Sequence, residues 1–306
     1  MTLPTPRRRT LLVAATATVA LPFGGLLQGC STPLPLGVQP TPGAPGEPKA
    51  AALLRASAEA HGLAAYRQIS DINIAYEGEW RPFINGVQPE VVDAGYRGRS
   101  QERLMPALGL NAQAYEGPSG RKFVAWQRGS ASSAGRLDLW FNGQPSTEAP
   151  LQRAAAVVAE SYNLFLLGPL WLTDRAVALQ AGGTERVDGR LCDVLDAWVR
   201  PGLGLSALDR VTLCIDRDNR ITRRMRFTLE GFERTQGAVA ETDTFDHQLR
   251  FGVLWPMRSF ERVLHPIALP AHDWRIAGLD VNRGYAREAL GGPVFSGAAA
   301  APARAL

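Results

Sequence analysis

Residues 188–216 read DGRLCDVLDAWVRPGLGLSALDRVTLCID and carry the pattern that decides the fold. Asp188-Gly189 is typical of a tight hairpin turn, two strand-like runs follow, and the stretch between them, rich in glycine, indicates a loop. The two runs therefore predict antiparallel neighbours. We predict a register in which Cys192 lies opposite Cys214. The same register places Asp196 opposite Arg210, which is a chemically sensible pair.

The strand pattern continues on both sides of this hairpin. Short runs are divided by Gly-rich or Asn-Gly breaks, a spacing typical of antiparallel neighbours rather than of βαβ units. Together with two helices, this pattern predicts an α+β, mainly antiparallel fold of roughly a dozen strands. The other strand-like runs are residues 69–80, 94–104, 110–116, 121–127, 136–141, 220–232, 239–251, 255–264 and 274–282.

The two predicted helices differ in character. The first begins at Pro48 and ends at Gly62, the residue types that favour a helix start and a helix end. The second has Ser146 or Thr147 as its cap and ends in an almost continuous apolar block at residues 162–172. A surface helix needs only an apolar stripe, so this end must be buried. It is either plain core or the lining of a cavity for an apolar ligand, and both interpretations stay open here.

Residues 1–29 have the order of a secretory signal: three arginines, an apolar run and a cleavage site. The final residues, Leu-Gln-Gly-Cys, resemble a bacterial lipobox, in which the signal is cut before a cysteine that carries a diacylglyceryl group. We therefore predict that Cys30 is lipidated. The alternative is an ordinary signal with an incidental cysteine. The paired arginines leave twin-arginine and general secretory export both open.

This signal sets the expected organisation of the mature chain. Residues 30–48 are proline-rich and predict an extended tether, residues 49–290 form the domain, and residues 291–306 form a flexible tail. Ser31 after the anchor, in place of aspartate, favours the outer membrane over the inner membrane. An oxidising compartment also permits a disulfide between Cys192 and Cys214; the alternative is two free buried thiols.

The charge balance excludes a polyanion-binding function. The chain has 33 Lys and Arg against 29 Asp and Glu, and removal of the three signal arginines leaves 30 against 29. No strong field is then available to attract nucleic acid, so we predict no nucleic-acid partner. Arg220, Arg224 and Arg226 share one face of a strand-like run. A phosphate or headgroup site and a solvated strand face are both consistent with that pattern.

Sequence signals for an enzyme are weak. The chain has no HExxH, no paired CxxC and no GxSxG, and the GxGxxA match at residues 202–207 lies between two strands, so we interpret it as a loop. We predict no catalytic residue, no metal and no cofactor; an envelope hydrolase is the alternative. The histidines lack a second ligand at metal spacing and are interpreted as capping or core residues: His61, His247, His265 and His272.

The order of elements resembles the LolA and LolB lipoprotein-localisation superfamily. The lipobox and tether, a first helix that ends in His61-Gly62, one inserted helix, and the segments GGTERVDGRLCDVL and FGVLWPMRSFER carry this resemblance. It implies a single strongly curved, unclosed β-barrel sheet, a half-barrel whose concave face is covered by helices. It also implies a cavity that holds acyl chains.

These observations predict a monomeric periplasmic lipoprotein that encloses an apolar ligand. Its partners are the membrane, through lipidated Cys30, and a lipid or lipoprotein cargo. The alternative is a structural or assembly partner at the outer membrane without a small ligand. The expected ligand-binding residues are aromatic strand residues and the apolar helix end: Trp80, Trp126, Trp140, Phe165, Leu166, Leu167 and Trp171.

Overall fold

The structure is a computed structural model that describes residues 47–130, 133–229, 238–264, 268–293 and 295. Cys30, the signal and His265 lie outside the described residues, as does the tether up to residue 46. The described residues belong to one compact unit. No described helix has the length and apolar character needed to cross a membrane.

Helices flank and interrupt the strands. The two long ones, α1 (Glu47–Ala60) and α5 (Ala149–Leu167), confirm the two helices predicted from the sequence. The short ones are α2 (Leu63–Tyr66), α3 (Pro82–Val87), α4 (Pro89–Val92) and α6 (Pro169–Leu172), with 3-10 turns η1 (Ala94–Tyr96), η2 (Pro106–Leu108) and η4 (Arg287–Leu290). Helices α3 and α4 were not predicted, because Asn85-Gly86 within α3 is also typical of a turn between strands.

The strands are mostly those that the sequence predicted. In chain order they are β1 (Ile72–Trp80), β2 (Arg99–Met105), β3 (Leu110–Gly117), β4 (Gly120–Gln127), β5 (Arg136–Phe141), β6 (Gln144–Pro145), β7 (Ala176–Val187), β8 (Arg190–Val199), β9 (Asp209–Asp216), β10 (Thr222–Thr228), β11 (Val239–Phe245), β12 (Gln248–Arg250), β13 (Val253–Trp255), β14 (Arg258–Val263) and β15 (Leu269–Val281). The predicted turn at Asp188-Gly189 is present, with positive φ at both residues as the tight hairpin requires.

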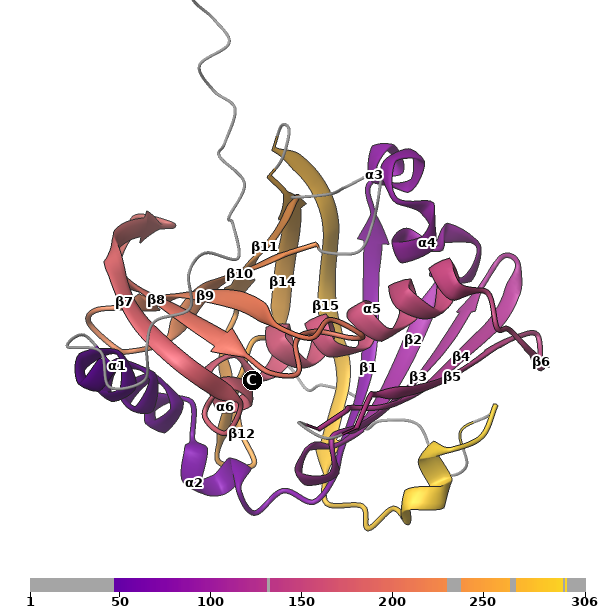
Figure 1. The fold of residues 1–306 in the computed structure, drawn as a ribbon, viewed down its shortest axis with the longest axis horizontal. Coiled ribbons are helices and arrows are strands. Elements are labelled where there is room, and N and C mark those ends of the chain that lie inside the picture. Colours follow the sequence, from indigo (N-terminus) through magenta and orange to yellow (C-terminus); the bar gives the residue numbers. More distant parts are fainter. Residues whose placement is uncertain (1–46, 131–132, 230–237, 265–267, 294, 296–306) are drawn as a thin grey trace, which may run out of the picture. The chain divides into compact units, whose positions relative to one another are not determined.

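One antiparallel sheet of 13 strands organises the domain, in the order β6-β5-β4-β3-β2-β1-β15-β14-β11-β10-β9-β8-β7. Strand β15 pairs with β1 and so joins the first run of strands to the last. The sheet curves and its edge strands β6 and β7 do not meet, as Figure 1 shows. Strands β12 and β13 form a separate hairpin. The predicted α+β half-barrel is therefore confirmed.

Helix α5 lies across one face of this sheet (Figure 1), which we call the inner face. Every residue of α5 from Ala154 to Leu167 is buried, so the helix is enclosed on all sides, as its apolar end predicted. Its start differs from the prediction. Glu148, rather than Ser146 or Thr147, occupies the cap position, and it makes no side-chain cap bond. The backbone N–H of Ser146 still donates to the carbonyl of the strand residue Leu139, so the helix begins after it.

The register between β8 and β9 corrects one prediction. Cys192 lies opposite Asp216 and Cys214 lies opposite Val194, two residues away from the register that we expected. The two cysteines are therefore diagonal neighbours, a relation that places backbones about 7–8 Å apart, beyond what a disulfide usually bridges. Both are buried free thiols in the structure.

Candidate functional site

A small apolar cavity lies on the inner face, between α5, the short helices α3 and α4, and strands β10, β14 and β15. We call it the α5 cavity. Its volume is about 40 Å³. Its walls are mainly aliphatic and aromatic: Trp80, Ile84, Gln88, Val91, Val92, Val157, Val158, Ser161, Tyr162, Phe165, Phe227, Leu229, Glu261, Val263 and Ala271.

An aromatic cluster lies beside the α5 cavity and contributes Trp80 and Tyr162 to its wall. The ring of His272 lies between Trp80, at 4.2 Å between centroids, and Trp274, at 4.6 Å. The hydroxyl of Tyr162 in α5 lies 3.2 Å from Nδ1 of His272. Burial lowers the pKa of His272 well below its ordinary value, so the imidazole is neutral and packs as an aromatic ring. This histidine is a core residue, as predicted.

Two polar groups of the wall lack partners. Glu261 makes no hydrogen bond or ion pair with the described residues, and burial raises the pKa of its carboxyl to about 7 against the opposing charge of Arg97. The indole Nε1 of Trp80 is also buried without an acceptor. Buried polar groups are nearly always hydrogen-bonded, so the unpaired indole N–H is a departure from this rule, whereas the Glu261 side chain is only half-buried.

Helices α3 and α4 cover the cavity, and charged contacts hold their C-terminal end. Arg97 donates hydrogen bonds to the carbonyls of Val91 and Val92, at 3.1 and 3.2 Å, while its guanidinium lies over the Tyr115 ring. Just beyond α4, Asp93 accepts from Nζ of Lys122 at 2.5 Å. Burial lowers the pKa of Lys122 to about 8, although Asp93 opposes this shift. The cover is therefore held by these charged contacts, by the backbone hydrogen bond from Arg81 to the carbonyl of Ala271 at the start of α3, and by the buried side chains of Ile84 and Val92.

A buried acid elsewhere in α5 joins three elements. The carboxylate of Glu160 accepts from Nε1 of Trp126 at 2.8 Å, from Arg128 at 3.0 Å and from Arg175 at 2.8 Å. Burial alone would raise the pKa of Glu160, but the two guanidinium groups and the indole bond outweigh it and hold the pKa below its ordinary value. Trp126 is therefore engaged in a structural bond rather than facing an open cavity.

The structure thus separates the residues that we expected to act together. Trp80 and Phe165 line the α5 cavity. Leu167 and Trp171 line a different hollow of about 70 Å³ beside Asn163 and Arg175. Leu166 is buried in the main core without lining either hollow.

Trp140 lies on the opposite face of the sheet. It packs on Phe123 at 5.5 Å between ring centroids, in a cluster that contains no residue of α5.

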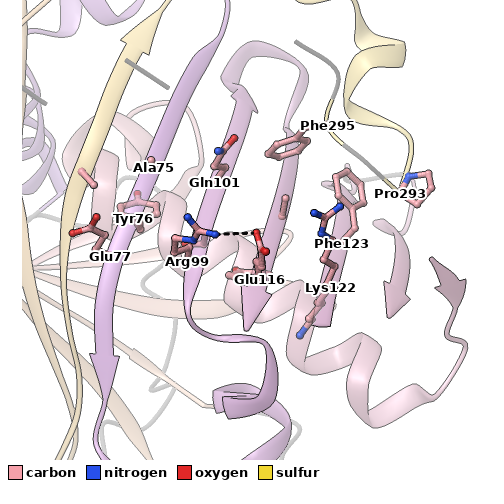
Figure 2. Close-up of a pocket in the computed structure, with 15 residues that line it drawn as sticks. Ala75, Tyr76, Glu77, Arg99, Gln101, Glu116, Lys122, Phe123, Pro293 and Phe295 are labelled. Carbon is pink, nitrogen blue, oxygen red and sulfur yellow. Dashed lines mark hydrogen bonds and ion pairs between the residues drawn. The ribbon is translucent and has the colours of Figure 1, made fainter. Parts of the chain in front are cut away.

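That opposite face, the outer face, carries a larger groove of about 380 Å³ (Figure 2). Phe123 and Phe295 form one wall, with ring centroids 5.3 Å apart, and Arg99 pairs with Glu116 at 3.4 Å across the groove. Phe295 also covers the guanidinium of Arg103. The charged groups around the groove are of both signs, so it has no strong preference for an ion of either sign.

The arginine stretch that followed the hairpin is fully paired. Arg224 and Arg226 both contact Glu185, and each also pairs with an acid of β11, while Arg220 pairs with Asp193. These partners neutralise the guanidinium groups, so this face is not a phosphate site.

Neither of the other described histidines is placed for catalysis. Nε2 of His61 accepts the backbone N–H of Thr222 at 3.0 Å, and burial lowers its pKa to about 4. Burial also lowers the pKa of His247, to about 3. Among the described residues, no group of three His, Cys, Asp or Glu side chains is arranged to hold a metal ion.

Signals for the missed residues were weak in the sequence. Glu261 lies in the run RSFERV, where alternation alone would turn Phe260 inward. The structure turns Ser259 and Val263 to the inside instead, because both are buried while Phe260 is not. The covering helices left a clearer trace, since each begins at a proline, Pro82 and Pro89.

Comparisons with known proteins concern the fold. The sequence matches no protein-family model and no curated protein. A DUF1329 family protein from Desulfovibrio piger is a similar solved structure, with 11% identity, a TM-score of 0.49, and coverage of 80% of this chain and 99% of that chain. A LolA superfamily protein from Nitrosomonas europaea has 14% identity and a TM-score of 0.42, with coverage of 79% of this chain and 96% of that chain. A putative outer membrane lipoprotein-sorting protein domain from Vibrio parahaemolyticus has 9% identity and a TM-score of 0.38, with coverage of 76% of this chain and 97% of that chain. The half-barrel that the LolA and LolB resemblance implied is present in the chain's own open sheet of 13 strands.

Proposed function

We propose that this chain is a lipid-anchored envelope protein that binds a hydrophobic ligand in the α5 cavity. The observation that supports this is a mainly apolar cavity whose cover, α3 and α4, is a separate short segment rather than part of the sheet. The ligand class is an acyl chain, a lipid or a lipidated protein, and the role is in envelope lipid or lipoprotein trafficking.

Binding requires the cover to move. A volume of 40 Å³ has room for little more than one or two water molecules, whereas ligand pockets usually have about 300–1,000 Å³. Burial of each methylene contributes about 0.8 kcal/mol, so a ten-carbon chain supplies about 8 kcal/mol, equivalent to a micromolar Kd before the cost of opening. The contacts of Arg97 and Lys122, together with the burial of Ile84 and Val92, set that cost.

The proposal is tested by lipid extraction and dye binding. Full chain purified in mild detergent-free conditions is extracted for lipid, and the binding of a fluorescent hydrophobic dye is measured. The variant Val158→Trp fills the cavity from α5 and is expected to abolish dye binding. Val187→Trp is the matched control, because Val187 is equally buried but lies in a separate cluster with the two cysteines. Both variants are checked for native melting.

The small volume also favours the second candidate, a structural or assembly partner without a small ligand. In that case the 40 Å³ space is ordinary imperfect packing. Absence of extractable lipid, together with dye binding that is absent or unchanged by Val158→Trp, would support this candidate and defeat the carrier.

The anchor is proposed from the sequence. Cys30 is expected to carry the lipid, with the domain in the periplasm and outer membrane favoured over inner. Labelling with radioactive palmitate is expected in the wild type and absent in Cys30→Ser, which should also move the protein from the membrane fraction to the soluble fraction. Equal labelling of both would remove the lipobox interpretation.

A further inference from the structure

The α5 cavity has a polar end formed by Glu261 and Trp80. Both residues line the cavity. Glu261 is half-buried and forms no hydrogen bond or ion pair with the described residues, whereas Nε1 of Trp80 is buried without an acceptor among them. A native interior seldom leaves a buried N–H unpaired, because it loses its bonds to water and gains none in the protein.

The sheet register places these two groups on either side of His272. Glu261 pairs with His272 between β14 and β15, and Trp80 pairs with His272 between β1 and β15. Residues that pair across an antiparallel sheet share a face, so the three side chains form one row on the inner face. Their backbones span two strand spacings, roughly 10 Å in total, and the Trp80 ring stacks on the imidazole, so the two cavity-lining residues flank His272 on the same stretch of the inner face.

His272 itself does not complete the pairing. Its Nδ1 already contacts the Tyr162 hydroxyl, and its ring faces are covered by Trp80 and Trp274. What the row offers to a ligand is therefore one N–H donor from the indole and one carboxyl group.

We propose that the α5 cavity takes a single-chain amphiphile whose uncharged head both donates and accepts a hydrogen bond, held between Glu261 and Trp80. This inference rests on the proposed function and names the ligand class for the same site. The head accepts from the indole N–H and donates to the Glu261 carboxyl, while the apolar chain lies along Phe165, Phe227 and Val263. A glycerol monoester is the simplest lipid with these properties.

The surroundings favour an uncharged head over an ionic one. An anionic head would meet the Glu261 carboxylate, and the nearby guanidinium of Arg97 is already engaged with the carbonyls of α4. A fixed cationic head such as a quaternary ammonium has no N–H to donate and would lose its hydration among aliphatic walls. The raised pKa of Glu261, about 7, means that the carboxyl is partly protonated near neutral pH and so imposes no fixed negative charge.

The test compares three probes that share one chain length: monoolein, methyl oleate and 1-octadecene. Each displaces a fluorescent dye from the full chain at pH 6.5. The monoolein head donates and accepts, the methyl ester only accepts, and the alkene does neither. Monoolein is expected to bind about five- to tenfold more tightly than methyl oleate, the effect of one net hydrogen bond. Methyl oleate should in turn bind more tightly than the alkene.

Variants assign each contact. Glu261→Leu is expected to weaken the binding of monoolein by about five- to tenfold and to leave the affinity for methyl oleate unchanged. Glu261→Gln is expected to keep the affinity for monoolein, because an amide oxygen still accepts a hydrogen bond. Trp80→Phe is expected to weaken the binding of both monoolein and methyl oleate but not the binding of 1-octadecene. Circular dichroism and melting confirm that each variant is folded.

Equal affinity of the wild type for all three probes, or equal loss of all three in Glu261→Leu, would overturn the polar end while leaving an apolar carrier in place. Failure of every probe to displace the dye, or of the dye to bind, would overturn the proposed function and this inference together.

Discussion

Replacement of Glu160 by glutamine should be among the most destabilising polar substitutions in the domain. The Glu160 side chain is fully buried, and its carboxylate faces Arg128 and Arg175, whose side chains are 20% and 8% exposed. Glutamine has nearly the same shape but no charge, so both guanidinium groups lose their counter-ion. Removal of one partner from a buried ion pair costs about 3–5 kcal/mol, and we expect a loss of unfolding free energy in this range.

Urea unfolding followed by circular dichroism measures this loss. Glu59→Gln is the matched control, because Glu59 also pairs with an arginine but is 56% exposed on α1, where the expected effect is about 0–1 kcal/mol. Trp126→Phe removes the indole bond to the same carboxylate together with part of a fully buried ring, so it should cost at least about 1.5–3 kcal/mol.

The pH dependence provides a second check on Glu160. Its pKa is depressed in the folded state, so its stabilising contribution is present above the unfolded value of about 4.3 and disappears as pH falls through the folded pKa. The gap in stability between wild type and Glu160→Gln should therefore be constant near neutral pH and shrink below about pH 4. A Glu160→Gln variant that unfolds at the same urea concentration as Glu59→Gln, with a gap independent of pH, would refute the charge-pair argument.

Three further outcomes follow from single contacts. Gly204→Ala should destabilise the domain by more than about 1 kcal/mol in thermal melts, because Gly204 has φ +58 and an added Cβ would lie 2.6 Å from the backbone of α5. Cys192 and Cys214 should resist alkylation in the folded protein and both react after unfolding, since burial raises the pKa of each, to about 12 for Cys214; peptide mass mapping reads this out. Phe295→Ala should cost about 1–2 kcal/mol in urea unfolding, because it uncovers the guanidinium of Arg103.

Local patterns in the sequence predicted most of the fold. Glycine at the end of α1, the Asp188-Gly189 turn and the apolar end of α5 each depend on neighbours in the chain, and all three are in the structure as expected. The sequence also indicated that Phe165 and Trp80 matter to a cavity, since large apolar side chains at such positions must be buried.

The site itself was harder to predict because it depends on which strands meet. Glu261 and Trp80 are far apart in the chain and become neighbours only because β15 lies between β14 and β1. Nothing in the run RSFERV marks its acid as unpaired. The face that Trp140 occupies is likewise decided by its pairing with Phe123 on the outer side of β4, which composition cannot reveal.

The two-residue error in the β8–β9 register shows where a sequence pattern loses its power. A slip of one residue would have moved every side chain to the other face, and burial excludes it. A slip of two keeps every face unchanged, so alternation fits both registers equally well. Even the predicted charge pair survives: Arg210 donates to Asp196 at 2.6 Å, but diagonally, since Asp196 lies opposite Thr212. Alternation could therefore not distinguish the register from which we inferred the disulfide from the register that the structure has. The loop at residues 200–208, rather than the strands, decides between these two registers.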